Sequence, residues 1–289
     1  MPEKIKLGLI QTSSEATHDG NVEKTFSLIR EAASKGAQII CTQELFTSDY
    51  FCQNHDEAHF NKAVDLPGGL TDATGVLARE LGVVIISSLF ERRDAGLYHN
   101  SATVHDADGS LLGIYRKMHI PEDPGFHEKY YFTPGDTGFK AFDTKFGRIG
   151  VLICWDQWFP EGARLTALEG AQILFYPTAI GVLPEEDDEV KREFMDAWEI
   201  MHRSHAVANG CYVAAVNRVG QEKDIRFWGD SFVSGPFGKI LAQAGDAEEI
   251  LISEIDFSLI EKQRRTWPFL RDRRIDAYEG ISKRMGRKS

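Results

Sequence analysis

The sequence alternates between short apolar runs and segments with helical periodicity, and this alternation limits the fold more than any other feature. The apolar runs are rich in Ile, Val and aromatic residues, and Gly, Asp or Pro stands beside most of them. Such runs are typical of strands that are covered on both faces. We therefore expect strands over residues 5–11, 37–44, 83–91, 98–105, 148–155, 171–178, 211–217 and 248–255.

Helical patterns lie between many of these strands. Apolar residues recur three and four positions apart and several segments end at a glycine, which predicts helices over residues 21–36, 70–82, 159–170 and 187–210. Residues 97–117 have the pattern of a hairpin, which adds antiparallel pairs to the sheet. Alternating strands and helices predict an α/β fold. Because no repeat and no linker rich in Pro, Gly or Ser divides the sequence, we expect a single domain over residues 1–289.

Charge and hydropathy limit the partners. The formal net charge of −11 predicts no nucleic-acid partner, because binding phosphates requires an excess of Lys and Arg. The charge agrees with a small cationic substrate, although surface solubility explains it equally well. No apolar run approaches the roughly 18 residues that span a bilayer, and the first residues lack the pattern of a signal peptide. We therefore expect no membrane association and a cytoplasmic location.

Cys154 stands where one apolar run ends and a helical pattern begins. The free N–H groups at a helix start favour a thiolate, so this position predicts a lowered thiol pKa. The same groups, that of Trp155 first, can bind an oxyanion. A lone cysteine at the end of a buried strand is nevertheless most often structural. The four cysteines are too few and too scattered for a disulfide framework, and Cys41 and Cys211 fit the structural interpretation.

Two further charged residues stand at the ends of predicted strands. Glu44 is the last residue of the predicted strand 37–44, and Lys117 follows the hairpin strand before Pro121. Either alone is most simply a surface charge. A carboxylate, an ammonium and a thiol at three strand ends form a stronger pattern, because strand ends on one side of a sheet converge and catalytic groups of α/β proteins gather there.

These three segments resemble the signature segments of the nitrilase superfamily of carbon–nitrogen hydrolases. The resemblance rests on "QELF" with Glu44, "YRKMHIP" with Lys117 and "ICWDQWFPEGARL" with Cys154, and it extends over nearly the whole chain. It implies a four-layer α-β-β-α sandwich that pairs through surface helices into homo-oligomers, a dimer or higher. It also implies a further glutamate beside the triad, at Glu128, which would orient Lys117 or share the proton transfers.

The resemblance further implies a thiol-dependent hydrolysis that needs no cofactor. The segments "SDYFCQ", "PGFHEKYYFTPGDTGFKAFDTKFG" and "WPFLRDRRIDAY" are similar to those of members that hydrolyse N-carbamoylputrescine to putrescine, carbon dioxide and ammonia, a step of polyamine biosynthesis. Cys154 would attack the carbamoyl carbon, Glu44 would act as base and then acid, and Lys117 would stabilise the oxyanion. A carbamoyl group on Cys154 would be the intermediate.

A substrate with a distal ammonium predicts a carboxylate in the pocket. The candidates are Asp49, Glu122, Asp123 and the acids of 185–188, and we favour Asp123 and Glu185. Trp155 and Tyr50 are expected to line the four-carbon chain, although a core role fits either residue equally well. Two alternatives stay open: a related hydrolase of carbamoyl or ω-amide compounds, such as N-carbamoyl-β-alanine, whose pocket would require arginine, and a non-catalytic interaction protein on the same scaffold.

The histidines do not predict a metal site. His55 and His59 stand four positions apart, but Asp56 occupies the position at which the zinc-protease helix carries glutamate. The spacing of His202 and His205 is also wrong for that motif. Most histidines of a long chain hydrogen-bond or lie at the surface, so we expect no bound metal.

The C-terminal residues 264–289 differ from the rest of the chain in charge. They hold nine Lys and Arg against three Asp and Glu, with Trp267, Phe269 and Leu270 among the arginines. Aromatic residues and arginine are enriched in protein interfaces. We therefore expect this segment to be an arm at a subunit interface, although its last six residues are most simply a solvated tail.

Overall fold

The computed structural model describes residues 2–286, and its strands form two large sheets. The first sheet has the order β16-β1-β2-β4-β5-β6, with β3 paired to β4. Its strands are β16 (Glu249–Asp256), β1 (Lys4–Gln11), β2 (Ile39–Thr42), β3 (Val64–Asp65), β4 (Val84–Asp94), β5 (Leu97–His105) and β6 (Leu111–Arg116). The second sheet has the order β15-β14-β11-β9-β8-β7. Its strands are β15 (Ile240–Gln243), β14 (Phe232–Ser234), β11 (Tyr212–Val216), β9 (Ile173–Pro177), β8 (Gly147–Val151) and β7 (Ala141–Thr144).

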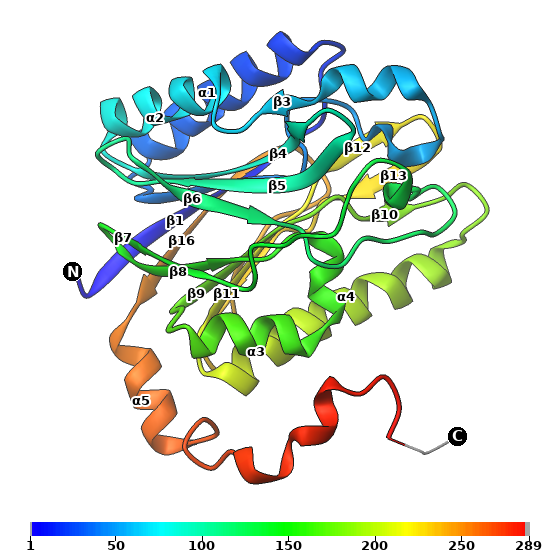
Figure 1. The fold of residues 1–289 in the computed structure, drawn as a ribbon. Helices are drawn as coiled ribbons and strands as arrows, with labels where there is room; N and C mark the ends of the chain where they lie inside the picture. The colour runs from blue at the N-terminus through cyan, green and yellow to red at the C-terminus, as the bar shows by residue number, and fades with distance from the viewer. Residues whose placement is uncertain (1, 287–289) are drawn as a thin grey trace.

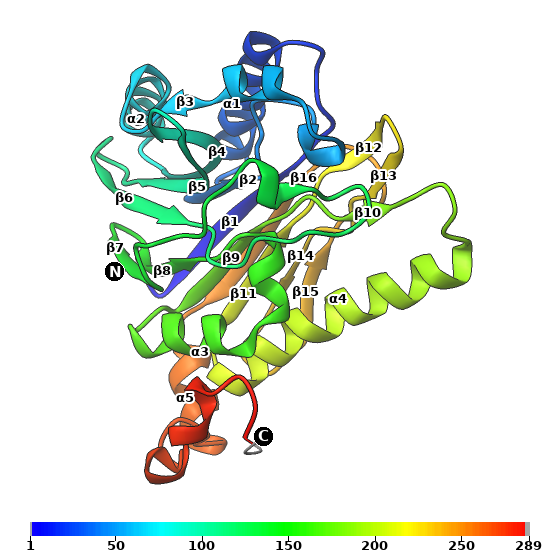
Figure 2. The same ribbon diagram turned by 45° about the vertical axis from the view of Figure 1, so that its right-hand side comes forward.

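The helices cover the outer faces of the two sheets (Figures 1 and 2). Helices α1 (His18–Ser34) and α2 (Gly69–Leu81) pack on the first sheet, where Ile29 and Leu77 bury their side chains against Ile40 and Ile85. Helices α3 (Pro160–Leu168) and α4 (Asp188–Asn209) pack on the second sheet through Ala163 and Ala206. The layers confirm the expected α-β-β-α sandwich.

The main core lies between the two sheets. Side chains of the first sheet, such as Leu9 and Ile86, form one apolar cluster with Ile149 and Phe175 of the second sheet. These residues are fully buried, as expected for strands whose sequences are nearly continuous runs of apolar residues. Burial of this area supplies the main driving force that holds the sheets together.

Local sequence signals explain the helix ends. Thr17 caps α1 by accepting a hydrogen bond from the N–H of Gly20, and Asp187 caps α4 in the same way. Pro160 opens α3, where its missing N–H costs nothing. Gly82 and Gly210 end α2 and α4 in the left-handed conformation, at φ of 66° and 55°. All four expected helices and all eight expected strands are confirmed, with shifted ends.

Strand direction brings the ends of β2, β6 and β8 to the same region. Strands β1, β2 and β4 are parallel to one another. Strand β5 is antiparallel to both β4 and β6, so β6 runs in the same direction as β2. In the second sheet β8, β9 and β11 are parallel, joined through α3 and α4. Glu44, Lys117 and Cys154 each follow the carboxyl end of one of these strands.

Some elements were not predicted from the sequence. The third, small sheet of β10 (Gly181–Val182), β13 (Ile225–Trp228) and β12 (Val219–Glu222) consists of strands too short to show a period. Helix α5 (Ser258–Thr266) follows β16 and leads into the C-terminal segment, which extends away from the sandwich below α3 (Figure 1). Among the described residues, no helix combines the length and the apolar character that a membrane crossing requires.

Candidate active site

Cys154 lies in a tight turn beyond the end of β8. The strand ends at Val151, earlier than expected, and residues Cys154–Trp158 form a single 3₁₀ turn before α3 begins. Cys154 has a φ of 41°, in the left-handed region that non-glycine residues seldom adopt. Such backbone strain persists only where surrounding contacts hold it, and it gathers at functional sites.

Asp156 supplies the contacts that hold this turn. Its carboxylate accepts hydrogen bonds from the N–H of Ile153 at 2.9 Å and from the hydroxyl of Tyr115 at 2.7 Å. The other oxygen accepts from the N–H of His119 at 3.0 Å. A fully buried carboxylate with these partners fixes the backbone on both sides of the thiol. Asp156 was not predicted as a site residue, although an acid directly after an apolar strand was a usable signal.

Glu44, Lys117 and Glu128 form a buried ion cluster next to the thiol. The ammonium of Lys117 donates to Glu44 Oε1 at 2.8 Å and to Glu128 Oε2 at 2.7 Å. The three side chains are at most 1% exposed. Buried charges are stable only when paired and hydrogen-bonded, so the cluster holds each member in one position. The structure thus brings together the four residues named as catalytic from the sequence.

The charges of the cluster set its protonation. Burial would lower the pKa of Lys117, but the carboxylates of Glu128 and Glu44 outweigh it and raise this pKa well above its ordinary value. Lys117 therefore stays an ammonium. Burial raises the pKa of Glu128 to about 7, although Lys117 and the Tyr50 hydroxyl act in the opposite direction.

The expected lowering of the Cys154 pKa is wrong. Burial and the negative charge of Glu44 raise the pKa of this thiol well above its ordinary value, although Lys117 opposes them. The α-helix that was expected to stabilise a thiolate starts only at Pro160, so the 3₁₀ turn separates it from the sulfur. Cys154 therefore rests as a thiol, and its sulfur could act as a nucleophile only if a neighbouring base took the proton.

The carboxylate of Glu44 has one hydrogen-bonded oxygen and one oxygen without a partner among the described residues. Its Oε1 accepts hydrogen bonds from Lys117 and, at 2.7 Å, from Asn100, whereas its buried Oε2 accepts none from the described residues. The buried guanidinium of Arg218 donates to the backbone carbonyls of Glu44 and Leu45 at 2.9 and 3.0 Å. One carboxylate oxygen is therefore held firmly while the other is left free to take a proton. Asn100 and Arg218 were not predicted as site residues.

A cavity of about 570 Å³ opens onto Cys154. Trp155, Asp123 and Glu185 line it as expected, together with Glu186, Phe126 and Trp158. The lining is mainly apolar with a few carboxylates, which suits a molecule with an aliphatic chain and a charged end.

Tyr50 does not line this cavity, which corrects its assignment to substrate binding. It is fully buried, packs on Phe126 and Phe227, and donates from its hydroxyl to Glu128 Oε1 at 2.8 Å. This buried position agrees with the core role that the sequence left open for Tyr50. Its role in the structure is to position Glu128.

Most other candidate acids are already paired. Asp49 forms an ion pair with Lys62, and Glu122 accepts from the ring of His127 at 2.7 Å. Asp187 caps α4. The carboxylates of Asp123 and Glu185 accept no hydrogen bond from any residue in the described part of the chain, and both face the cavity.

Tyr50→Phe is expected to move the pH dependence of catalysis. The Tyr50 hydroxyl lowers the pKa of Glu128, so its loss should raise that pKa above about 7. The inflection of kcat/KM that Glu128 contributes should then shift to higher pH. Parallel pH profiles of the wild type and the variant measure the shift, with Tyr98→Phe as control because the Tyr98 hydroxyl makes no side-chain hydrogen bond within residues 2–286. An unmoved inflection in Tyr50→Phe would exclude Glu128 as its source.

Comparisons with known proteins show the family to which this chain belongs. The family model described as Carbon-nitrogen hydrolase matches residues 6–265. An N-carbamoylputrescine amidase of Solanum lycopersicum is 47% identical over 96% of this chain and 96% of the relative. A citrullinase of Francisella tularensis subsp. tularensis is 41% identical over 96% and 98%.

The fold agrees equally well. The crystal structure of a carbon-nitrogen hydrolase from Helicobacter pylori G27 superposes with a TM-score of 0.95, at 47% identity, and covers 97% of this chain and 99% of that chain. This similarity extends through both sheets and the four covering helices. The resemblance found in the sequence is therefore confirmed, and the chain belongs to the carbon-nitrogen hydrolase family.

Proposed function

We propose that this enzyme hydrolyses N-carbamoylputrescine to putrescine, carbon dioxide and ammonia, with Cys154 as nucleophile. The observation that carries the proposal is the buried cluster of Glu44, Lys117 and Glu128 beside a thiol that opens onto a cavity with free carboxylates. The amidase of Solanum lycopersicum, similar over almost its whole length, supports this substrate.

The first half of the reaction transfers the carbamoyl group to sulfur. Glu44 takes the Cys154 proton as the sulfur attacks the carbamoyl carbon, and the carbonyl π electrons move to oxygen. Lys117, held as an ammonium, stabilises the negative oxygen together with the N–H of Trp155. Glu44 then gives the proton to the substituted nitrogen, and the C–N bond breaks. Putrescine departs, and the carbamoyl group remains on the Cys154 sulfur as a thioester.

The second half releases the carbamoyl group with water. Glu44 accepts a proton from a water molecule as its oxygen adds to the thioester carbon, and the C–S bond breaks with return of the proton to sulfur. The product carbamic acid decomposes to carbon dioxide and ammonia. Glu128 supports both halves by positioning Lys117, and its pKa of about 7 also lets it share the proton transfers.

The cavity favours a cationic over an anionic substrate end. Its lining contains Asp123, Glu185 and Glu186, and among the residues that the structure describes it contains no Arg or Lys. N-carbamoyl-β-alanine would bring a carboxylate towards these acids, and like charges repel strongly in a low-dielectric cavity. Citrulline, the second candidate because of the citrullinase relative, carries an ammonium and a carboxylate at the same end.

Substrate preference tests this assignment. We expect kcat/KM for N-carbamoylputrescine to exceed that for N-carbamoyl-β-alanine by on the order of 100-fold, because one unpaired buried charge costs about 3 kcal/mol. Asp123→Asn and Glu185→Gln should each reduce the preference about tenfold, mainly through KM. The exposed Glu189 on α4 does not line the cavity, so Glu189→Gln is the matched control. A preference for the anionic substrate, or equal effects of all three variants, would contradict the assignment.

We also propose that the chain forms a single domain whose segment 264–289 is an arm that contacts a second copy. Its residues 287–289 lie outside the described residues. The described part exposes large apolar side chains, with Ile275 at 74% and Ile281 at 68% exposure. Trp267 stacks on Phe237, which ties the base of the arm to the sandwich. Large apolar side chains exposed within a short segment support an interaction surface.

Charged substitutions in the arm are expected to separate the subunits. Ile275→Asp combined with Ile281→Asp should convert an oligomer to monomers in sedimentation velocity, because two carboxylates would be buried at the interface. Leu112→Asp on the edge strand β6, 36% exposed in the wild type, is the control and should leave the oligomer intact, because it lies neither in the arm nor on a surface helix. The proposal that the arm contacts a second copy would be disproved if the wild-type chain sediments as a monomer, or if the Ile275→Asp, Ile281→Asp variant keeps the size of the wild-type oligomer.

A further inference from the structure

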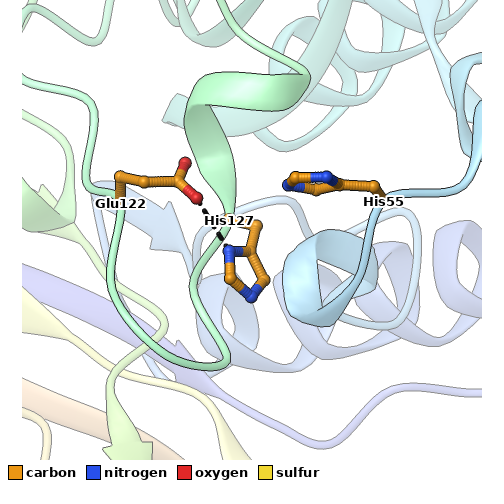
Figure 3. Close-up of side chains that lie close together, drawn as sticks. All are labelled: His55, Glu122 and His127. Atoms are coloured by element: carbon orange, nitrogen blue, oxygen red, sulfur yellow. Dashed lines mark hydrogen bonds and ion pairs between the residues drawn. The ribbon is translucent and has the colours of Figure 1, made fainter.

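Two histidines and a glutamate meet outside the catalytic cluster. His55 lies in the turn before the 3₁₀ helix Glu57–Lys62, whereas Glu122 and His127 lie in the loop that follows Lys117 (Figure 3). One potential ligand atom from each side chain lies within 4.8 Å of the other two. The spacing of His55 and His59 did not predict this cluster, because the partner of His55 is distant in sequence.

Backbone contacts hold the loop that carries two of these ligands. Asp123 and Phe126 pair across a tight turn, which places the flanking Glu122 and His127 side by side. The N–H of His127 also donates to the carbonyl of Cys52 at 2.7 Å, which ties this loop to the segment that leads to His55. The ring of His127 forms a hydrogen bond with Glu122 Oε1 at 2.7 Å, so these two groups already face each other.

The ring of His55 is oriented by its neighbours. It stacks on Tyr130 with a centroid distance of 4.4 Å and an interplanar angle of 10°, and it lies 5.1 Å from the ring of His127. Stacking restricts rotation of the imidazole. The third ligand is therefore held beside the other two rather than free in solvent.

The donor set fits a divalent transition metal. Two imidazoles and one carboxylate are ligands that Zn²⁺ binds, whereas Ca²⁺ and Mg²⁺ require oxygen ligands almost alone. Tetrahedral Zn²⁺ with bonds of about 2.0–2.2 Å needs ligand atoms roughly 3.4 Å apart. Side-chain rotations that move each ligand atom by about 1 Å would bring the three atoms to this spacing. The side chains of His127 and Glu122 are 32% and 37% exposed, so an ion can enter and water can complete its coordination.

We propose that His55, Glu122 and His127 bind one divalent ion of the Zn²⁺ class at the edge of the substrate cavity. Asp123 and Phe126, which lie between the two loop ligands, line that cavity. The bound ion would link the loop to the segment of His55 and fix one cavity wall. The ion takes no part in the hydrolysis, because its ligands belong neither to the cavity lining nor to the buried ion cluster.

Calorimetric titration with ZnSO₄ tests the site. Cys154→Ala protein is used, because a thiol that opens onto the cavity can bind added zinc, whereas Cys41, Cys52 and Cys211 are fully buried. We expect one ion per chain, and His55→Ala or His127→Ala in this background should weaken binding on the order of 100-fold. His18→Ala is the control, because His18 also lies exposed beside a carboxylate, that of Asp19.

Electron paramagnetic resonance of the Cu²⁺-loaded Cys154→Ala chain gives an independent measurement. The spectrum is expected to show coupling of the copper electron spin to two imidazole nitrogens. His55→Ala and His127→Ala should each reduce the number of coupled nitrogens to one. Far-ultraviolet circular dichroism of each variant should match the parent, since all three ligands are at least partly exposed. The proposal is overturned if no ion binds up to about 1 mM ZnSO₄, or if binding survives His55→Ala and His127→Ala unchanged.

Discussion

Cys154→Ser is expected to abolish the hydrolysis of N-carbamoylputrescine, with a loss in kcat of about 10⁴-fold or more. A hydroxyl is a far weaker nucleophile than a thiol, and it gives up its proton to a carboxylate far less readily. Ammonia release from N-carbamoylputrescine measures the loss. Serine fills nearly the same volume and preserves the strained turn, so thermal unfolding should remain close to that of the wild type.

Activity measurements on the wild type and on Cys154→Ser also distinguish a thiol-dependent hydrolase from a non-catalytic interaction protein. Substantial turnover by Cys154→Ser would reject the cysteine as nucleophile. A wild type without activity on any carbamoyl compound would favour a non-catalytic interaction protein on this scaffold. The intact cluster of Glu44, Lys117 and Glu128 argues for the enzyme, because three buried charges are costly and serve no purpose in a scaffold alone.

Lys117→Met is expected to impair both catalysis and folding. The oxyanion loses its cation, so kcat should fall about 10³-fold. The carboxylates of Glu44 and Glu128 lose their shared partner while fully buried, so the free energy of unfolding should fall by about 3–5 kcal/mol. Urea unfolding monitored by tryptophan fluorescence measures the second effect.

The stability loss of Lys117→Met should depend on pH. Without the ammonium, the pKa of Glu128 rises further, and protonation then removes the uncompensated charge of this buried carboxylate. Native glutamates with a raised pKa hold protons that the unfolded chain has released, so stability falls as pH rises. The deficit against the wild type should therefore be larger at pH 8 than at pH 5. Lys117→Met with Glu128→Gln should regain stability but not activity, and a deficit that is independent of pH would contradict this explanation.

The sequence predicted the fold well because long periodic segments dominate it. Eight strands and four helices carry clear patterns, and their alternation implies an α/β fold, whereas the four-layer sandwich was implied by the resemblance to the nitrilase superfamily. The three charged or reactive residues at strand ends were also visible, since each interrupts an apolar run. The small sheet and α5 escaped prediction because their segments are short and their stability comes from tertiary contacts.

The supporting residues could not be predicted for a different reason. Asn100 lies inside a strand and Arg218 beyond another, and only the packed sheets bring them to Glu44. Tyr50 was assigned to the cavity because sequence proximity does not show which side of a loop a side chain faces. The thiol pKa was misjudged because burial and neighbouring charge, which oppose the effect of a helix start, are properties of the folded chain.

The two halves of the reactive machinery belong to different sheets. Glu44 and Lys117 follow strands of one sheet and Cys154 follows a strand of the other, so neither sheet holds a functional fragment on its own. Enzymatic turnover therefore shows whether the two sheets have packed against each other. During refolding, the first product molecules should emerge only with the last cooperative step, and never from a partly assembled chain.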